Sequence, residues 1–433
     1  MNVTLAARLP PRDWKGSAMS AGQRVVITGL GAVTPCGNTV PAMWEALLAG
    51  RSGVGPITRF DASGFAIRIA GEVRGFSLDP AVDPREARRM PLYVRYALNA
   101  VLEAVRDAHL DMTREDPEQV GVVFGSGAGG LDLIFDNHDV LRERGPRRVS
   151  PTLIANMIPD SASGYIAIQL GAQGPNMAVV AACSTGGHNV GEAYELIRRG
   201  DAAVVIAGGS EAPIYPTIVA SFSNMRGLAE DNLNPERACK PFDARRDGFI
   251  LSEGAGALVL ESLDHALARG APIVAEIVGY GNSCDASDMI AADEQGRGAA
   301  RAMAMALRKS GLPPEAVDYI NAHGTGTPLN DLAETRAIKS VFGDHAYRLA
   351  VSSTKSMLGH MMGAAGAVEA LICALVVREG RIPPTINLEE PDPDCDLDYV
   401  PNTARTADVR VALSNSIGLG GHNSALLLQR FEG

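Results

Sequence analysis

The stretch Met177-Ala-Val-Val-Ala-Ala-Cys183-Ser-Thr-Gly-Gly-His-Asn189 carries the strongest structural signal in this chain of 433 residues. Residues 177–182 are apolar and include two adjacent valines, which predicts a short, fully buried strand. Residues 184–199 predict a helix, because apolar residues recur at helical spacing, two arginines lie in the last turn and Gly200 ends it. A second buried strand, residues 202–207, follows directly. This β-α-β pattern places the thiol of Cys183 where a strand turns into a helix.

The position of Cys183 suggests a nucleophile. Free backbone N–H groups and the helix dipole at such a junction favour a thiolate, and the small residues around it let a substrate carbonyl approach. The alternative is a buried structural cysteine, since free cysteine is among the most buried residue types. This segment alone leaves both interpretations open.

Strand-like and helical segments alternate along the whole chain, which predicts an α/β fold with at least one largely buried sheet. Helical periodicity is clearest in residues 96–108, 299–310 and 364–377. The remaining predicted strands are residues 24–28, 120–124, 256–260, 274–280, 317–321, 348–352 and 410–414.

A weak internal repeat in the sequence suggests that the chain has two similar halves. Ala182-Cys183-Ser184 follows a strand and opens a helix, and Ser352-Ser-Thr-Lys355 follows a strand shortly before another helix. We predict a flexible N-terminal tail over residues 1–22, a first half over residues 23–268 and a second half over residues 269–433.

Composition excludes several classes of protein. The net charge of −11 argues against nucleic acid or an anionic membrane as a partner. No apolar run reaches about 18 residues, so no membrane span is expected, and no signal peptide is recognisable at the N-terminus. The six cysteines are far apart and form no CxxC pair, which argues against a zinc site or a disulfide scaffold and fits a reducing cytoplasm.

Three further segments carry polar groups at strand ends. They are Asn321-Ala-His323-Gly-Thr325-Gly-Thr327, Ser352-Ser-Thr-Lys355-Ser-Met-Leu-Gly-His360 and Ser414-Asn-Ser-Ile-Gly-Leu419-Gly-Gly-His-Asn423. Each has a structural explanation: a satisfied core histidine, a solvated lysine, a helix cap or a glycine turn. Taken with Cys183 they indicate a covalent thiol enzyme, because ligand sites in α/β sheets lie at strand ends. The glycine-rich loop of residues 125–130 lacks the spacing of a dinucleotide site.

Together these segments resemble the condensing enzymes of fatty acid synthesis, the β-ketoacyl-acyl-carrier-protein synthases, and most closely the type II elongating synthases. The likeness runs from Val25-Val-Ile-Thr-Gly-Leu-Gly31 to Gly420-Gly-His-Asn423 and includes Pro383-Pro-Thr-Ile-Asn387. It implies the thiolase-type fold of two similar α/β halves in five layers, αβαβα, usually as a homodimer. It also implies decarboxylative condensation of an acyl chain with malonyl-acyl carrier protein.

The resemblance assigns roles to individual residues. Cys183 is the acyl-accepting nucleophile, and His323 and His360 bind the malonyl thioester carbonyl and promote decarboxylation. Lys355 organises the site around His360. Thr325 and Thr327 bind the pantetheine arm of the carrier. The backbone amides of Cys183 and Leu419 form the oxyanion hole, and no metal or redox cofactor is required.

The sequence departs from the family pattern around the acyl pocket. Ile417 and Leu419 replace phenylalanines of the glycine-rich turn, Ala128 replaces an isoleucine, and Asp288 replaces a histidine. We therefore expect a longer or wider acyl pocket, unless Phe222 or Met225 fills the space. For carrier docking the candidates are Arg68 and Arg226, which resemble carrier-contacting positions of the family, and also Arg88 and Arg89.

Three alternatives stay open to different degrees. A ketosynthase of a dissociated polyketide or specialised-lipid pathway would share every catalytic motif and could form a heterodimer with a chain-length subunit. A non-catalytic chain-length subunit typically lacks the nucleophilic cysteine, which is present here as Cys183. A coenzyme A thiolase uses a second cysteine near the C-terminal glycine loop, where this chain has His422.

Overall fold

The computed structural model describes residues 22–433, so the predicted tail of residues 1–22 lies outside the described part apart from its last residue. Ten strands form one mixed sheet in the order β10-β9-β13-β14-β8-β1-β7-β6-β4-β5. The strands are β1 (Val25–Val33), β4 (Val120–Gly125), β5 (Asn176–Met177), β6 (Val204–Glu211), β7 (Gly254–Ser262), β8 (Ala275–Cys284), β9 (Tyr319–Asn321), β10 (Ala350–Ser352), β13 (Val411–Gly418) and β14 (His422–Gln429). Two short ribbons pair β2 (Gly55–Pro56) with β3 (Ile69–Ala70), and β11 (Arg381–Ile382) with β12 (Arg405–Thr406).

The two halves of the sheet repeat one strand order. Outward from the centre they run β1-β7-β6-β4-β5 and β8-β14-β13-β9-β10, which is first, fifth, fourth, second and third in chain order. β4 pairs in parallel with β5 and β6, as β9 does with β10 and β13. β7 pairs antiparallel with β1 and β6, as β14 does with β8 and β13. β1 and β8 join the halves by antiparallel pairing. The predicted α/β fold with two similar halves is confirmed, while the predicted boundary at residues 268/269 stays a prediction.

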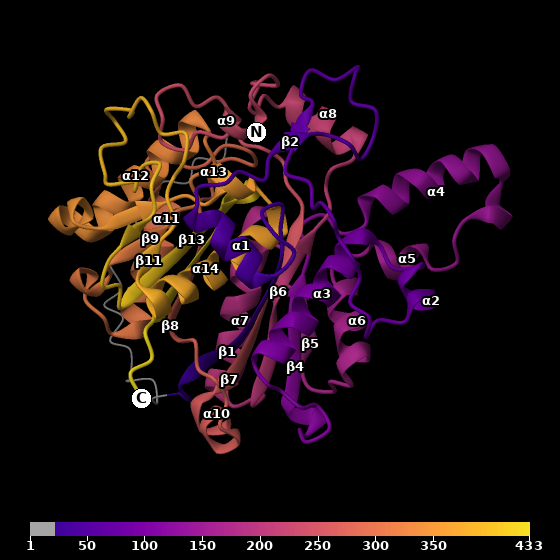
Figure 1. The fold of residues 1–433 in the computed structure, drawn as a ribbon, viewed down its shortest axis with the longest axis horizontal. Coiled ribbons are helices and arrows are strands. Elements are labelled where there is room, and N and C mark those ends of the chain that lie inside the picture. The colour runs from indigo at the N-terminus through magenta and orange to yellow at the C-terminus, as the bar shows by residue number, and fades with distance from the viewer. Residues whose placement is uncertain (1–21) are drawn as a thin grey trace, which may run out of the picture.

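Helices form a layer inside the folded sheet and one layer on each outer face (Figure 1). α7 (Thr185–Arg199) and α14 (Ala365–Glu379) pack against each other, and α14 contacts strands of both halves and is buried from Ala365 to Val377. α3 (Leu92–Asp107) and α6 (Ser161–Leu170) cover the first half of the sheet. α11 (Arg297–Ser310) and α12 (Pro328–Phe342) cover the second half. The order is therefore helix, sheet, helix, sheet, helix.

Glycines in β1 and β8 bring the outer helices unusually close to the sheet. A Cβ at Gly31 would lie 1.8 Å from the carbonyl oxygen of Ala100 in α3, and one at Gly281 would lie 2.0 Å from that of Ala302 in α11. Only glycine permits such an approach, which buries the small apolar residues of both helices. The two glycines lie in the first strand of each half, so this close contact between strand and helix is part of the structural repeat.

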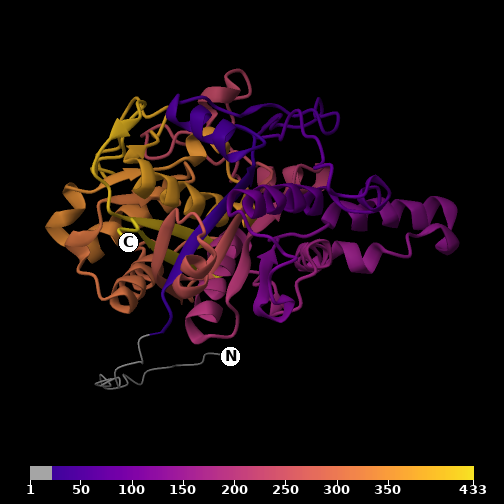
Figure 2. The ribbon, with the colours of Figure 1, turned by 60° about the horizontal axis from the view of Figure 1, so that its bottom comes forward.

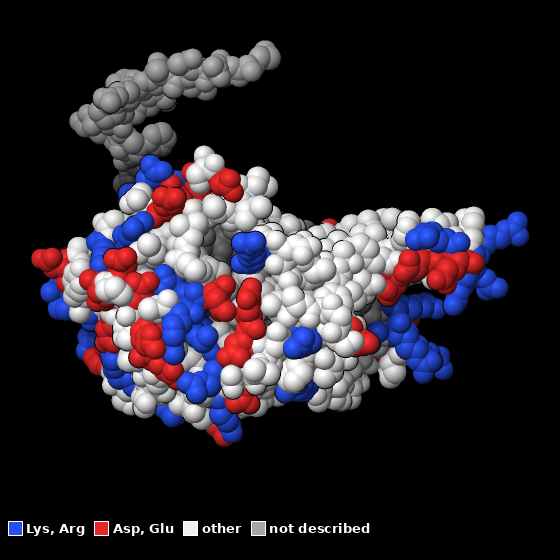
Figure 3. Space-filling view, turned by 90° about the horizontal axis from the view of Figure 1, so that it is seen from above, with Lys and Arg blue, Asp and Glu red and all other residues white. Residues whose placement is uncertain are grey.

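The segment around α4 (Leu131–Arg144) projects from the body as an arm, as Figures 1 and 2 both show. No residue of α4 is buried, and Ile134, Leu141, Ile154 and Ile158 expose apolar side chains there. Four arginines lie near its end (Arg142, Arg144, Arg147 and Arg148), where Figure 3 shows a group of basic side chains. The remaining α-helices are α1 (Val40–Leu48), α2 (Pro84–Ala87), α5 (Leu153–Met157), α8 (Pro216–Asn224), α9 (Pro235–Ala238), α10 (Leu263–Arg269) and α13 (Lys355–Leu358). Within residues 22–433, no helix is both long and apolar enough to cross a membrane.

One predicted strand is wrong and another is longer than predicted. Residues 177–182 do not form a fully buried strand, since β5 spans only Asn176–Met177 and Val180 is half exposed. This strand lies at the edge of the sheet, and the chain leaves it at once to reach the turn before Cys183. The predicted strand of residues 410–414 is longer than expected, because β13 continues to Gly418, and the predicted glycine-rich turn is the tight turn Leu419–Gly421 before β14.

Candidate active site

Cys183 lies in a tight turn between the sheet and a buried helix. A 3-10 turn, Ala182–Ser184, precedes α7, and Ala182 has a φ of 49°, a left-handed conformation that costs about 1–3 kcal/mol for a residue with a Cβ. Side chains hold the turn, since Ser184 Oγ donates to the carbonyl of Ala181 and the N–H of Ala181 donates to Thr185 Oγ1. Cys183 lines a cavity at this turn.

The second half contains the same turn, but not at Ser352–Lys355, where the weak sequence repeat predicts it. Residues Met362–Ala364 form a 3-10 turn before α14, and Met362 has a φ of 47°. Gly363 is therefore the counterpart of Cys183, and the predicted correspondence with Ser352–Lys355 is wrong. The connection to this turn, residues 353–361, is longer than residues 178–181 in the first half. Lys355 and His360 lie in that longer connection.

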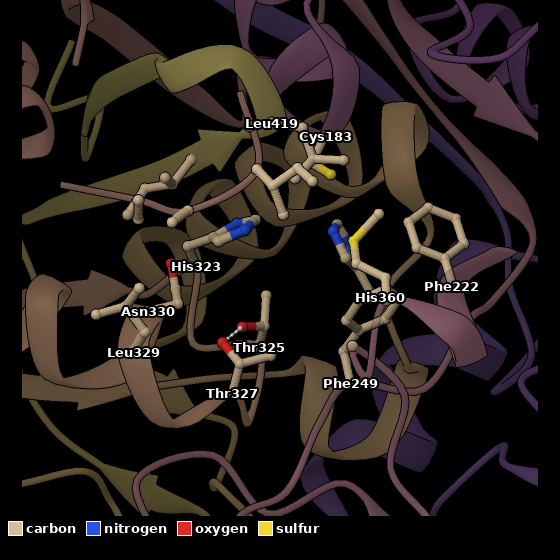
Figure 4. Close-up of a pocket in the computed structure, with 17 residues that line it drawn as sticks. Cys183, Phe222, Phe249, His323, Thr325, Thr327, Leu329, Asn330, His360 and Leu419 are labelled. Carbon is tan, nitrogen blue, oxygen red and sulfur yellow. Dashed lines mark hydrogen bonds between the residues drawn. The ribbon is translucent and has the colours of Figure 1, made fainter. Parts of the chain in front are cut away.

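His323 and His360 face each other across the cavity (Figure 4). Their ring centroids are 5.3 Å apart with the planes at 87°. The backbone N–H of His323 donates to Glu334, a buried carboxylate that also accepts the N–H of Gly324. The N–H of His360 donates to the carbonyl of Ile250. Both rings are thus positioned by backbone contacts and leave their edges free for a ligand.

The cavity has a volume of about 270 Å³ and brings the predicted groups together. Its lining consists of Cys183, Phe222, Met225, Gly227, Phe249, Ile290, Ala291, Ala292, His323, Thr325, Thr327, Leu329, Asn330, His360, Ile417, Gly418 and Leu419. The hydroxyls of Thr325 and Thr327 lie 3.0 Å apart on the side away from Cys183 (Figure 4). Seen from above, the molecule is visibly hollowed on one face (Figure 3).

Lys355 lies behind the histidines and is buried, so the alternative of a solvated lysine is wrong. Its ammonium donates to the carboxylate of Glu369 in α14, which is equally buried. Burial raises the pKa of Glu369 to about 7, and the charge of Lys355 opposes that rise. A buried ion pair therefore sits beside the two imidazoles.

Both imidazoles are neutral at physiological pH. Burial holds the pKa of His360 well below its ordinary value, and the positive charge of Lys355 adds to this effect. The pKa of His323 is lowered by burial, by Lys355 and by His360. Nδ1 of each ring is buried and has no hydrogen-bond partner among residues 22–433, so Nε2 is the nitrogen open to the cavity.

The Cys183 thiol is protonated in the free site. Burial raises its pKa to about 11, while the N–H groups of Leu419 and Cys183 and the charge of Lys355 oppose that rise. The free N–H groups lower the pKa of the thiol in the expected direction, but the loss of hydration is the larger effect. The two amides that contact the sulfur are those predicted to bind an oxyanion.

We expect the alkylation rate of Cys183 to rise about tenfold per pH unit from pH 7 to pH 9.5, because only the thiolate reacts and its fraction grows steadily below a pKa of about 11. Iodoacetamide labelling followed by mass spectrometry measures this rate, and the Cys183→Ala variant corrects for the other cysteines. A plateau below pH 8 would show instead that the amides and Lys355 outweigh burial.

The other predicted residues lie in several places. Ala128 follows β4, and its N–H donates to Glu211, but it is not part of the cavity lining. Arg226 is exposed between Met225 and Gly227, which do line the cavity. Arg68 is exposed, and its N–H donates to Asn232. Arg88 and Arg89 lie elsewhere, beside α5, where the carbonyl of Arg89 accepts from Asn156.

Sequence reasoning missed three residues of the site. Phe249 packs edge-on against His360, with 5.3 Å between ring centroids, and lines the cavity. Glu334 binds the amides around His323, and Glu369 pairs with Lys355. Glu369 has a recognisable signal, because a single carboxylate within the apolar run of residues 365–377 requires a buried partner.

The chain is similar to known proteins over nearly its whole length. Sequence models described as "Beta-ketoacyl synthase, N-terminal domain" and "Beta-ketoacyl synthase, C-terminal domain" match residues 22–266 and 274–389. The 3-oxoacyl-[acyl-carrier-protein] synthase 2 of Synechocystis sp. is 50% identical over 410 residues, covering 95% of this chain and 99% of that protein. Its namesake from Staphylococcus aureus (strain COL) is 48% identical over 414 residues, covering 96% of this chain and 100% of that protein.

Solved structures share the fold. The ishigamide ketosynthase/chain length factor has a TM-score of 0.87 and 39% identity, and it covers 95% of this chain and 100% of that chain. A β-ketoacyl synthase from Burkholderia phymatum has a TM-score of 0.88 and 35% identity with the same coverage. The type II ketosynthase AntDE, in complex with its acyl carrier protein AntF and bound to the hexaketide, has a TM-score of 0.86 and 34% identity, again with that coverage. The predicted layered α/β architecture is confirmed by this likeness.

Proposed function

The chain belongs to the β-ketoacyl synthase family and is a condensing acyltransferase, and we propose that Cys183, His323 and His360 carry out its two half-reactions. The reaction joins an acyl chain to malonyl-acyl carrier protein with loss of CO₂ and gives a β-ketoacyl-carrier two carbons longer. The observation that supports these roles is geometric: one buried thiol and two neutral imidazoles open onto a single cavity.

Acylation is the first half-reaction. The sulfur of Cys183 attacks the thioester carbonyl of the acyl-carrier, its proton passes to the departing carrier thiol, and the acyl group remains on the enzyme. The tetrahedral intermediate carries a negative oxygen, for which the amides of Cys183 and Leu419 are the available donors. In other enzymes one such donor contributes about 10²–10³ in rate.

Decarboxylation and condensation form the second half-reaction. Nε2–H groups of His323 and His360 donate to the malonyl thioester oxygen and stabilise the enolate left when CO₂ departs. Neutral imidazoles suit this role because they stabilise the negative oxygen without readily protonating the carbanion. The carbanion attacks the acyl group on Cys183, and the thiolate leaves. Loss of CO₂ supplies the electron pair, so the proposed chemistry needs no metal or redox cofactor.

The proposed partner is an acyl carrier protein. Thr325 and Thr327 offer hydroxyls to its pantetheine arm on the wall opposite Cys183. Carriers of this kind are acidic and this chain has a net charge of −11, so docking requires local basic residues. Our candidates are Arg68 and Arg226, which is exposed between two residues that line the cavity. The six free cysteines fit the proposed location in the cytoplasm.

A homodimer is the proposed assembly. β5 is an edge strand whose outer side carries unpaired backbone groups, and Met177, Val180 and Ile168 are exposed around it. The apolar residues of the α4 arm extend this surface. A second copy would cover both, whereas a heterodimer with a chain-length subunit is the alternative, since one structural relative is a ketosynthase/chain length factor pair.

Fatty acid elongation is the pathway that the names of the curated relatives support. The polyketide or specialised-lipid pathway is the second candidate, favoured by Leu419 in place of an aromatic gate and by the likeness to type II ketosynthases. Phe222 and Met225, the two residues that could fill the space, both line the cavity, and Phe222 packs edge-on against Phe249 with 5.4 Å between ring centroids.

We expect Leu419→Phe to shift loading toward short acyl chains by about tenfold or more, because added bulk in a hydrophobic pocket is worth ~1–3 kcal/mol. Competition between octanoyl- and palmitoyl-carriers, read by mass spectrometry of the acyl-enzyme, measures the shift. Leu267→Phe on the exposed face of α10 is the matched control. An unchanged chain-length profile in Leu419→Phe would refute the altered pocket.

Reconstitution with purified carriers tests the proposed function as a whole. Octanoyl-carrier and malonyl-carrier together should yield 3-oxodecanoyl-carrier with one CO₂ per product. If malonyl-carrier stays intact and no product forms with any chain length, the proposed reaction is wrong.

A further inference from the structure

The turn that carries Thr325 and Thr327 is held from behind by one buried arginine, Arg246. This residue lies between α9 and β7, and its side chain is 5% exposed. Nε donates to the carbonyl of Thr327 at 3.3 Å, and Nη2 donates to the carbonyl of Pro328 at 3.0 Å. Two of its nitrogens thus contact the backbone at the point where the turn enters α12.

Carboxylates fix the guanidinium in this position. Nη1 donates to Asp392 at 2.6 Å, and Nε lies 3.7 Å from the buried carboxylate of Asp331. Asp331 also accepts the N–H of Gly326 at 3.2 Å, inside the turn itself. Arg246 and Asp331 therefore hold the turn from its carbonyl and its amide side respectively.

The backbone next to Arg246 contacts the same turn. The N–H of Gly248 donates to the carbonyl of Gly326 at 3.1 Å. Gly326 has a φ of 80°, which an ordinary residue adopts only under strain, so the turn depends on external contacts for its shape. The adjacent Phe249 packs against His360. Residues 246–249 thus contact both the turn that carries Thr325 and Thr327 and the ring of His360.

We propose that Arg246 is a positioning residue that orients the hydroxyls of Thr325 and Thr327 toward the pantetheine arm and so sets the KM for carrier-bound substrates. The inference rests on the proposed role of the two threonines. Arginine is required because its planar fork reaches both carbonyls and a carboxylate at once, which a lysine ammonium does not. Arg246 touches no reacting atom, so the chemical step itself is spared.

The test compares Arg246→Lys with Arg245→Lys, its exposed neighbour, which pairs with Asp243 and Glu389. For Arg246→Lys we expect the KM for malonyl-carrier to rise about tenfold, which corresponds to the loss of one charge-assisted hydrogen bond. The kcat should stay within about threefold of the parent value. The KM for a truncated malonyl thioester that lacks the outer part of the arm should not change. Arg245→Lys should leave both values as in the parent.

A double-mutant cycle separates positioning from a general structural role. In the Thr325→Val/Thr327→Val background the Arg246→Lys substitution should add little to the KM, because its effect passes through the hydroxyls. Full additivity, or an equal rise in KM for both substrates, would overturn the proposal. If Arg246→Lys does not fold, Asp392→Leu removes the carboxylate that Nη1 contacts and should raise the KM ratio in the same direction, and an unchanged ratio would overturn the proposal. Failure of the proposed function would show differently, as absence of condensation by the parent enzyme.

Discussion

Replacing Cys183 with alanine is expected to lower condensation by at least about 10⁴-fold, because no other thiol lines the cavity. The fold should survive, since a small residue replaces a small one in a turn held by Ala181, Ser184 and Thr185. Formation of β-ketoacyl-carrier, followed by chromatography, measures activity, and a thermal melt measures stability.

The matched control is Cys373→Ala, a change to a fully buried cysteine of α14 that lies outside the cavity lining. It should retain activity while losing stability of about 1 kcal/mol through the small cavity created. Condensation by Cys183→Ala at a rate near that of the parent would remove the cysteine from the mechanism. Equal loss of activity in both variants would indicate damage to the fold rather than to the site.

Removing either imidazole is expected to separate the half-reactions. His323→Ala and His360→Ala should each lose malonyl decarboxylation by about 10²–10³-fold, the effect of removing one donor to a developing oxyanion. Acylation of Cys183 should stay within about tenfold of the parent, because its oxyanion donors are backbone amides. Release of labelled CO₂ from malonyl-carrier and intact-protein mass spectrometry measure the two steps separately.

His138→Ala on the exposed face of α4 is the control for this pair and should leave both steps unchanged. The opposite pattern, with slow acylation and normal decarboxylation in both histidine variants, would show that the roles of the thiol and imidazole groups are assigned wrongly.

Local sequence patterns predicted the turn and helix around Cys183, as well as three groups that line one cavity, Cys183, His323 and His360. The signals that predict α7 are its helical spacing, the arginines of its last turn and Gly200. They are sufficient to predict this helix because they all act within one element. His323, Lys355 and His360 follow β9 and β10, two neighbouring parallel strands, so their proximity follows from the topology.

Features that depend on distant segments were not predictable in this way. Lys355 is buried and pairs with Glu369 on the next long helix, and although the apolar run around Glu369 indicates a buried partner, no local pattern identifies Lys355 as that partner. Residues 177–182 have the composition of a core strand but lie at a sheet edge, so their exposure depends on what pairs there. Burial likewise decides the protonation of Cys183, against the effect of the helix terminus.

Arg246 shows the same limit. It contacts the carbonyls of Thr327 and Pro328, which are 81 and 82 residues away in the chain. Next to the exposed Arg245, its sequence context gives no sign that one arginine is buried and the other is not.

The central claim is that the acyl chain is carried on Cys183, and intact-protein mass spectrometry tests it most directly. After incubation with octanoyl-carrier alone, the enzyme should gain the mass of one octanoyl group per chain, and peptide mapping should place it on Cys183. Malonyl-carrier added next should remove the adduct as 3-oxodecanoyl-carrier forms. An adduct on any other residue, or condensation without an acyl-enzyme, would contradict the account.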